Sequence, residues 1–262
     1  MADDGDDVFV YLGGDQVVPQ DVRHIIINRS VKIIPARAFY ERTKLISVKM
    51  HEGIKIIEIE AFYHCLFLRK IKLIGVTEVK GTAFYNCRAL NVEFGDKLEI
   101  IQSRAFWRCT SLRKIRLPSV RTIGEYAFAD CDQLMKVEMP DVERIHNYAF
   151  LRCFSLRRIA IPDNNIDFDN LQQRYNQFHD CSNLATVDLV GGIHNTTSSL
   201  LLQRWTDDMN SEIHRINQVL PNMFHANEKT AVIDQWIRTV LRRMEHYKAE
   251  HNKLLREATT VL

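Results

Sequence analysis

Residues 105–118 read AFWRCTSLRKIRLP, and residues 127–140 read AFADCDQLMKVEMP. The two stretches share an Ala-Phe pair, a Cys three residues after the Phe, a Leu three residues after the Cys, and a final Pro. From Phe39 to Phe178 the repeat Phe recurs at spacings of 23, 22, 22, 22, 22 and 28 residues. Self-similarity at such a period indicates a repeat architecture in which each unit forms one coil of a solenoid.

The repeat supplies three columns of like residues. The first column contains Phe39, Phe62, Phe84, Phe106, Phe128, Phe150 and Phe178. The second contains all six cysteines of the chain, namely Cys65, Cys87, Cys109, Cys131, Cys153 and Cys181. The third contains Leu45, Leu68, Leu90, Leu112, Leu134, Leu156 and Leu184. Because a coil this short cannot bury its own apolar face, we expect about seven consecutive coils to stack with like residues in contact.

The segment after each Leu follows the pattern L-x-x-I-x-L, as in Leu112, Ile115 and Leu117. Alternation of apolar and polar residues with period two indicates a short β-strand with one buried face. Pro118 and Pro140 follow two of these segments, and proline favours the end of a strand because it supplies no ladder donor. The sequence therefore predicts a repeat solenoid in which the short strands of successive coils form a parallel sheet.

The unit A-F-x-x-C-x-x-L-x-x-I-x-L-P resembles the BspA-like subfamily of leucine-rich repeats, over about residues 22–190. The resemblance implies a right-handed leucine-rich-repeat coil that acts as a binding scaffold with an unspecified ligand. Val120 and Val142 stand where many leucine-rich repeats have Asn or Cys after the strand. We expect an acidic N-terminus and cap at 1–21, the solenoid at 22–192 and a helical tail at 193–262.

The tail changes from the 22-residue period to helical spacing. One predicted helix has an apolar face and ends at Pro221; this face contains Leu201, Trp205, Met209, Ile213, Ile216 and Leu220. A second helix is predicted from about Lys229 to the terminus, with a face of Ile233, Ile237, Val240, Met244, Tyr247, His251, Leu254, Ala258 and Val261. This face predicts either a helical hairpin that caps the solenoid or a homodimer through the long helix.

The cysteine column admits three interpretations: a disulfide ladder, a metal site, or buried structural residues. The chain contains no C-x-x-C motif, and successive cysteines lie 22 or 28 residues apart. These spacings are not those of zinc ligands. We therefore favour buried structural cysteines, and we expect no metal and no cofactor.

Outward positions of the predicted strands carry a basic stripe, which contains Lys70, Lys72, Lys114, Arg116, Lys136 and Arg158. Glu93, Glu138 and Asp188 interrupt the stripe. Three interpretations remain open: a solvated face of mixed charge, a site for an acidic protein partner, and a site for nucleic acid, which is the least favoured.

Aromatic residues follow the repeat Phe in four consecutive coils, at Tyr40, Tyr63, Tyr85 and Trp107. Stacked aromatics at this spacing form either a ladder that presents side chains to a partner or a ladder that packs only on itself. The last coil contains six extra residues within the stretch 163–177, which we interpret as a surface loop.

The remaining features of the sequence favour a non-catalytic protein. The 35 Lys and Arg residues nearly balance the 33 Asp and Glu residues, so the overall charge indicates neither a nucleic-acid nor a membrane partner. No phosphate-binding, metalloprotease or serine-hydrolase motif is present in the sequence, so we expect no small-molecule substrate. We expect an intracellular location, cytoplasmic or nuclear, because residues 1–7 lack the basic and apolar regions of a secretory signal.

These observations predict a protein–protein interaction scaffold that binds its partner through the sheet face and the loops. Two other classes stay open at this point. One is a surface adhesin, which requires export, and the other is a binder of an anionic polymer or nucleic acid through the basic stripe.

Overall fold

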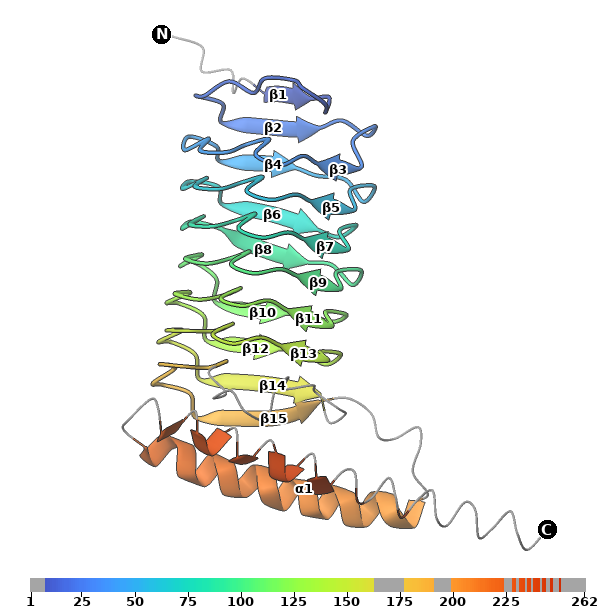
Figure 1. Cartoon of the computed structure of the whole chain (residues 1–262), viewed down its shortest axis with the longest axis vertical. Coiled ribbons are helices and arrows are strands. Elements are labelled where there is room, and N and C mark those ends of the chain that lie inside the picture. The colour runs from blue at the N-terminus through green and yellow to red at the C-terminus, as the bar shows by residue number, and fades with distance from the viewer. Residues whose placement is uncertain are drawn as a thin grey trace, which may run out of the picture.

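A computed structural model of the protein describes residues 8–162, 177–190, 199–223 and part of 228–250. The chain winds into a column of stacked coils, with the first strand at one end and a helix across the other (Figure 1). The strands run across the column, and strands of successive coils stack in two rows along its axis. The predicted fold class, a parallel-strand solenoid with a helical C-terminal part, is confirmed.

The longer strands form one face, which we call the long-strand face. Its strands are parallel and lie in the orders β1-β2-β4-β6-β8 and β10-β12-β14-β15. Their bounds are β1 Val8–Tyr11, β2 His24–Ile27, β4 Ser47–Lys49, β6 Lys70–Leu73, β8 Asn91–Phe94, β10 Lys114–Arg116, β12 Lys136–Glu138, β14 Arg158–Pro162 and β15 Thr186–Val190. Seven of these strands follow the seven repeat Leu positions, as the L-x-x-I-x-L pattern predicts.

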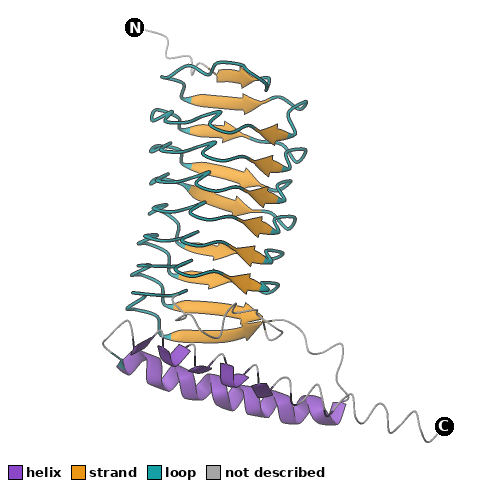
Figure 2. Ribbon diagram, viewed as in Figure 1, coloured by secondary structure: helices purple, strands orange, loops and turns teal. Residues whose placement is uncertain are grey.

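Six two-residue strands form a second parallel sheet, the short-strand face, which the sequence pattern did not indicate. They are β3 Ile33–Ile34, β5 Ile56–Ile57, β7 Glu78–Val79, β9 Ile100–Ile101, β11 Thr122–Ile123 and β13 Arg144–Ile145, in the order β13-β11-β9-β7-β5-β3. Two residues are too few to show an alternation of period two, so only stacking reveals these strands. Figure 2 shows both rows of strands joined by loops.

The core contains the predicted columns of repeat Phe, Cys and Leu residues. The seven repeat Phe residues are at most 3% exposed, and successive rings stack with centroids 4.9 to 5.4 Å apart. All six cysteines are buried and free. Each thiol donates to the carbonyl oxygen of the repeat Phe in the preceding coil, as Cys109 Sγ does to Phe84 O at 3.2 Å. The interpretation of the cysteines as buried structural residues is confirmed, and no disulfide joins them.

In the six coils from Phe39 to Phe150, two turn positions adopt the left-handed backbone conformation. They lie two residues before and two residues after the repeat Phe, as at Arg104 (φ 59°) and Arg108 (φ 60°). The backbone N–H groups of these two residues donate to Glu125 O and Ala129 O of the next coil, both at 2.9 Å. These turns therefore carry hydrogen bonds from coil to coil outside the two sheets.

Helix α1, Ser199–Val219, covers the last strand (Figures 1 and 2). Met209 and Ile216 on the predicted apolar face are buried, and so is Leu220, which begins the 3₁₀ turn Leu220–Asn222 that contains Pro221. The side chains of the predicted face residues Leu201 and Trp205 lie outside the described residues. The described helices contain no segment long and apolar enough to cross a membrane.

All described residues between 228 and 250 are helical. Ile233 and Val240 of the predicted face are buried, but so is Trp236, which the predicted face omitted. Trp236 Nε1 donates to Glu212 O of α1 at 3.0 Å, and Arg243 pairs with the Glu212 carboxylate at 2.9 Å. The remaining predicted positions, Ile237, Met244, Tyr247, His251, Leu254, Ala258 and Val261, lie outside the described residues.

Polar side chains close the last coil. Asn217 of α1 accepts a hydrogen bond from Val187 N–H at 2.9 Å and donates to Val187 O at 3.3 Å. Lys229 Nζ donates to Ser182 O at 2.6 Å and to Leu184 O at 3.3 Å. Burial lowers the pKa of the Lys229 ammonium. The helices thus cap the solenoid, while a homodimer through the second helix stays a prediction.

The opposite end of the ladder is closed by one side chain. Leu12 N–H donates to Gln16 Oε1 at 2.6 Å, and Gln16 Nε2 donates to Val10 O at 3.2 Å. A neighbouring parallel strand would bond to this same donor and acceptor on either side of Tyr11. The Gln16 amide therefore occupies the place of an additional strand residue beside β1.

Candidate functional site

The basic stripe lies on the long-strand face, where five of its six residues are exposed and Lys136 is half-buried. Lys114, Lys136 and Arg158 are in register on β10, β12 and β14, and Arg116 is opposite Glu138. Lys70 and Lys72 lie on β6, beside Asn91 and Glu93 of β8. Neighbouring strands of a sheet are about 4.8 Å apart, so the three cations in register span about 10 Å along the column.

Carboxylates of the same face pair with most of the stripe. Glu93 accepts from Lys72 at 3.0 Å and lies 3.6 Å from Lys70. The hydrogen bond from Lys72 holds the pKa of Glu93 below its ordinary value, and Lys136 has the same effect on the pKa of Glu138. Arg158 pairs with Asp188.

Three carboxylates do not balance six cations, so the stripe keeps an excess of positive charge. Exposed ion pairs contribute about 0 to 1 kcal/mol each. They therefore hold the cations in place only weakly, and a ligand carboxylate can compete with them.

Lys114 of the stripe takes part in no ion pair among the described residues. Two further exposed arginines share this property, Arg113 beside β10 and Arg157 beside β14. Sequence reasoning missed both, because an alternating strand pattern assigns the residue before Lys114 or Arg158 to the inner face. The start of each strand lies at a turn instead, and the arginine there is exposed.

The predicted aromatic column is a continuous half-buried ladder. Tyr40 stacks on Tyr63 and Tyr63 on Tyr85, each pair at 4.9 Å between centroids and within 8° of parallel. Trp107 meets Tyr85 edge-on at 5.5 Å. The stacked ring faces are taken up by neighbouring rings, so mainly edges and hydroxyl groups are free to meet a ligand.

The ladder continues beyond Trp107 through residues that the sequence pattern did not assign to it. Tyr126 stacks on Trp107 at 5.5 Å, and Tyr148 stacks on Tyr126 at 5.1 Å. These tyrosines precede the repeat Phe by two residues, whereas Tyr40, Tyr63, Tyr85 and Trp107 follow it by one. The guanidinium of Arg104 lies 5.6 Å from the Trp107 ring and 5.5 Å from the Tyr126 ring, where it bridges the two halves of the ladder.

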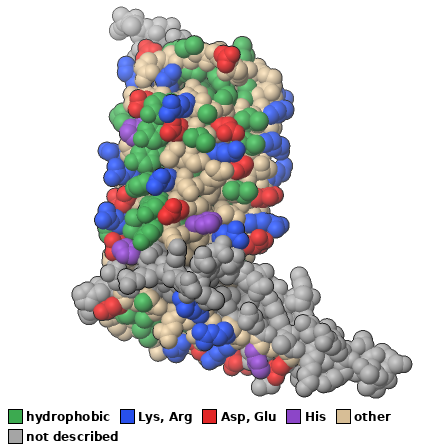
Figure 3. All heavy atoms as spheres, in the orientation of Figure 1, with side chains coloured by type: hydrophobic (Ala, Val, Ile, Leu, Met, Phe, Trp, Pro, Cys, Tyr) green, Lys and Arg blue, Asp and Glu red, His purple; other side chains and the backbone are tan. Residues whose placement is uncertain are grey.

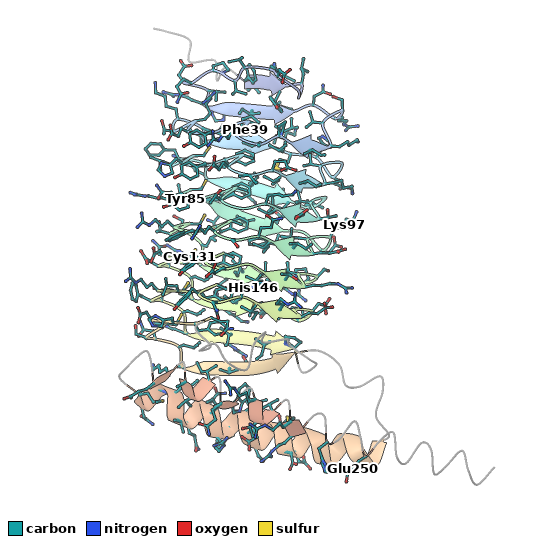
Figure 4. The ribbon with its side chains drawn as sticks, in the orientation of Figure 1. Phe39, Tyr85, Lys97, Cys131, His146 and Glu250 are labelled. Carbon is teal, nitrogen blue, oxygen red and sulfur yellow. The ribbon has the colours of Figure 1, made fainter. Side chains whose placement is uncertain are left out.

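The stripe and the ladder occupy different parts of the coil. Tyr85 of the ladder lies at one edge of the column (Figure 4), whereas the stripe residues lie on the strands of the long-strand face. Trp107 is separated from Lys114 by a turn that includes the buried Cys109 and Leu112. On the face drawn in Figure 3, basic and acidic side chains are intermixed. The basic stripe and the aromatic ladder therefore form two neighbouring surfaces and not one patch.

An open hollow of about 660 Å³ lies on the turns whose residues flank the cysteine column, which we call the cysteine-side turns. Its lining residues are Asn86, Arg88, Arg108, Thr110, Asp130, Asp132, Gln133, Arg152 and Phe154. Asp130 is engaged by Trp107 Nε1 at 2.8 Å. Burial, and to a lesser degree Asp130, raises the pKa of the Asp132 carboxyl. Gln133 accepts from Arg113 Nε at 3.3 Å, so the hollow adjoins the start of β10.

A second hollow of about 510 Å³ lies on the short-strand face, around Gly124, Gln102 and His146. A side chain at Gly124 would place its Cβ 2.5 Å from Ser103 N, so glycine is required there for close packing of the coils. Across the described part of the chain, no three His, Cys, Asp or Glu side chains are grouped so as to hold a metal ion.

Three solved structures of bacterial leucine-rich-repeat proteins are similar to this chain. The Treponema pallidum protein TpLRR is 19% identical, with 71% of this chain and 82% of that chain covered and a TM-score of 0.41. A leucine-rich cell surface protein of Faecalibacterium prausnitzii is 18% identical, with coverage of 66% and 61% and a TM-score of 0.32. A leucine-rich repeat protein of Eubacterium ventriosum is 19% identical, with coverage of 65% and 49% and a TM-score of 0.46.

The chain thus spans less than two thirds of the length of the second and third of these proteins. The search of curated proteins found no match. The model of the BspA type leucine rich repeat region matches six copies, over residues 20–88 and 99–227, which is more than half of the sequence. The chain therefore belongs to the BspA-type leucine-rich-repeat family.

Proposed function

We propose that the protein is a non-catalytic scaffold that binds a protein partner through the long-strand face and the adjoining turns. The observation that carries the proposal is the row of cations Lys114, Lys136 and Arg158, in register on three neighbouring strands, with Lys114 and Arg158 exposed and Lys136 half-buried. The buried Phe and Cys columns hold these strands rigidly, so the row is organised before a ligand arrives.

Membership of a repeat family supports the same function, because solenoids use their extended faces for binding. The aromatic ladder adjoins this face and adds half-buried tyrosine edges, a residue type enriched at protein interfaces. An acidic partner surface fits the excess of positive charge, since complementary charge accelerates encounter and fixes the register of a complex.

Affinity capture from an extract of the cell that makes the protein tests the proposal. The sheet variant carries Lys70→Glu, Lys114→Glu and Arg116→Glu. The control variant carries Lys32→Glu, Lys55→Glu and Lys97→Glu, all exposed and outside the long-strand face. Both change the net charge by the same amount, and equal melting curves establish that both fold.

We expect one stoichiometric protein to be captured by the wild type and the control and to be lost from the sheet variant. Capture that is equal for all three proteins contradicts a role of the face. Recovery of nucleic acid that dissociates steeply as salt is raised replaces the proposal with polyanion binding.

A further inference from the structure

The carboxylates of the long-strand face are confined to one position along the strands, which also carries the cations Lys72 and Arg116. The three carboxylates Glu93, Glu138 and Asp188 all lie at the third strand position. Of the six positions at and just before the start of β10, β12 and β14, five carry cations and one carries Met135, and none carries an acid; the five cations form the start cluster, Arg113, Lys114, Lys136, Arg157 and Arg158. The row of strand starts thus carries positive charge alone, and we call this row the positive margin of the sheet.

Three of the five cations in the start cluster are available to bind a ligand. Arg158 and Lys136 are paired with carboxylates of the third position. Within the described ranges 8–162 and 177–190, no ion pair involves Arg113, Lys114 or Arg157, and all three are exposed. A ligand carboxylate would meet these three charges without first displacing an acid of the same chain.

An apolar side chain lies next to the start cluster. Phe154 is 46% exposed, three residues before Arg157, and it lines the hollow of about 660 Å³ on the cysteine-side turns. Gln133 joins the two features, because it lines the hollow and accepts from Arg113 Nε. Aromatic residues, phenylalanine included, are enriched at protein interfaces.

The margin is narrow. The third strand position lies two residues from the first, which is about 6.6 Å along a strand. A single extended peptide fits this width. A nucleic-acid duplex, whose grooves alone are about 6 and 12 Å wide, would place phosphates against Glu138 and Asp188. The spacing therefore favours a peptide over a duplex.

We propose that the start cluster binds an extended acidic segment of a protein partner, which runs along the solenoid axis and inserts an apolar side chain beside Phe154. This assignment rests on the proposed scaffold function and specifies the partner by its chemistry. Carboxylates of the segment contact Arg113, Lys114 and Arg157, and the apolar residue occupies the hollow.

Fluorescence anisotropy with labelled peptides tests the assignment. One probe is a peptide of about twelve residues, rich in glutamate and with one central phenylalanine, and the second replaces that phenylalanine with serine. A single-stranded oligothymidylate of similar charge is the competitor. The cluster variant carries Arg113→Glu, Lys114→Glu and Arg157→Glu, and its matched control is the Lys32→Glu, Lys55→Glu, Lys97→Glu variant.

We expect the cluster variant to weaken binding of the phenylalanine peptide at least about tenfold at physiological salt, and the control to leave it within about twofold. Phe154→Ser should weaken only the phenylalanine peptide. Asp132→Asn should strengthen binding of both peptides, because it removes a carboxylate from the hollow.

Equal losses in the cluster and control variants overturn the assignment, since they indicate unspecific attraction. Stronger binding of the oligonucleotide than of either peptide overturns it as well. If the extract partner is lost from the sheet variant but the cluster variant still binds the peptide, the scaffold function stands and only this assignment fails.

Discussion

Turn residues near the repeat Phe carry backbone strain that the fold requires. Thirteen non-glycine residues of the described part have φ between 53° and 60°. Most residue types reach this region only at a cost of about 1 kcal/mol or more, and β-branched residues are the most disfavoured. The strain is tolerated because the backbone N–H groups of eleven of these residues donate to the next coil, as that of Thr82 does to Ser103 O at 3.1 Å.

Thr82 is the β-branched member of this set, with φ at 53°. We expect Thr82→Gly to raise the free energy of unfolding by about 1 kcal/mol, because glycine adopts positive φ without the Cβ clash. Ser103→Gly is the control, since Ser103 lacks positive φ and the same change there should lower stability by about 0.5 to 1 kcal/mol. Chemical denaturation measures both, and equal effects of the two substitutions would contradict the role of strain.

The cysteine column makes a second prediction for single residues. Burial raises the pKa of the thiols of Cys87, Cys109, Cys131 and Cys153 above the ordinary value. Only the thiolate is a strong nucleophile. We expect these thiols to stay unmodified by iodoacetamide at pH 9, where a free cysteine reacts readily, and to react fully once guanidinium unfolds the protein. Mass spectrometry counts the labels, and rapid native labelling of Cys109 would contradict its burial.

Among the elements, helix α1 is the one that closes the ladder. Its Asn217 side chain satisfies both the N–H and the carbonyl of Val187, which no further coil covers. Buried polar groups of a strand cost about 1 to 3 kcal/mol when they are left without a partner.

We therefore expect Asn217→Ala to lower the free energy of unfolding by about 1 to 3 kcal/mol and to speed hydrogen exchange at the Val187 amide. The neighbouring Gln218 is exposed and bonds only within the helix, to His214. Gln218→Ala is the control and should leave that amide protected. Unchanged exchange at Val187 in the Asn217 variant would show that the helix, and not its amide, closes the strand.

For the whole molecule, the two ends of the column differ. Helix α1 covers the last strand, whereas the edge of β1 is closed by the Gln16 amide. Val8 and Val10 beside this edge are 47% and 45% exposed. An open strand edge with apolar side chains tends to pair with another chain.

We expect Gln16→Ala to produce concentration-dependent association, because it exposes Val10 O and Leu12 N–H at the edge of β1. Gln133→Ala, in the middle of the column, should leave the protein in the state of the wild type. Sedimentation velocity over a hundredfold range of concentration distinguishes the two. A Gln16 variant that sediments like the wild type at every concentration would refute a protective role of the amide.

The sequence by itself determined the contacts between equivalent positions of neighbouring coils. A period of 22 residues places Phe106 on Phe84 and Cys109 beneath the Phe84 carbonyl, whatever the path of the chain between them. The strands after each repeat Leu and the register of Lys114 with Lys136 follow from the same period. For this reason the core, the cysteine column and the order of the basic stripe could be predicted from the sequence.

Only the tertiary structure decided the contacts between non-equivalent positions. Tyr126 joins Trp107 although the two occupy different places in their repeats, and Glu138 pairs with both Lys136 of its own strand and Arg116 of the preceding one. The exposure of Arg113 depends on the turn that precedes β10. Such contacts follow from the path and width of each coil, and a repeat period carries no information about either.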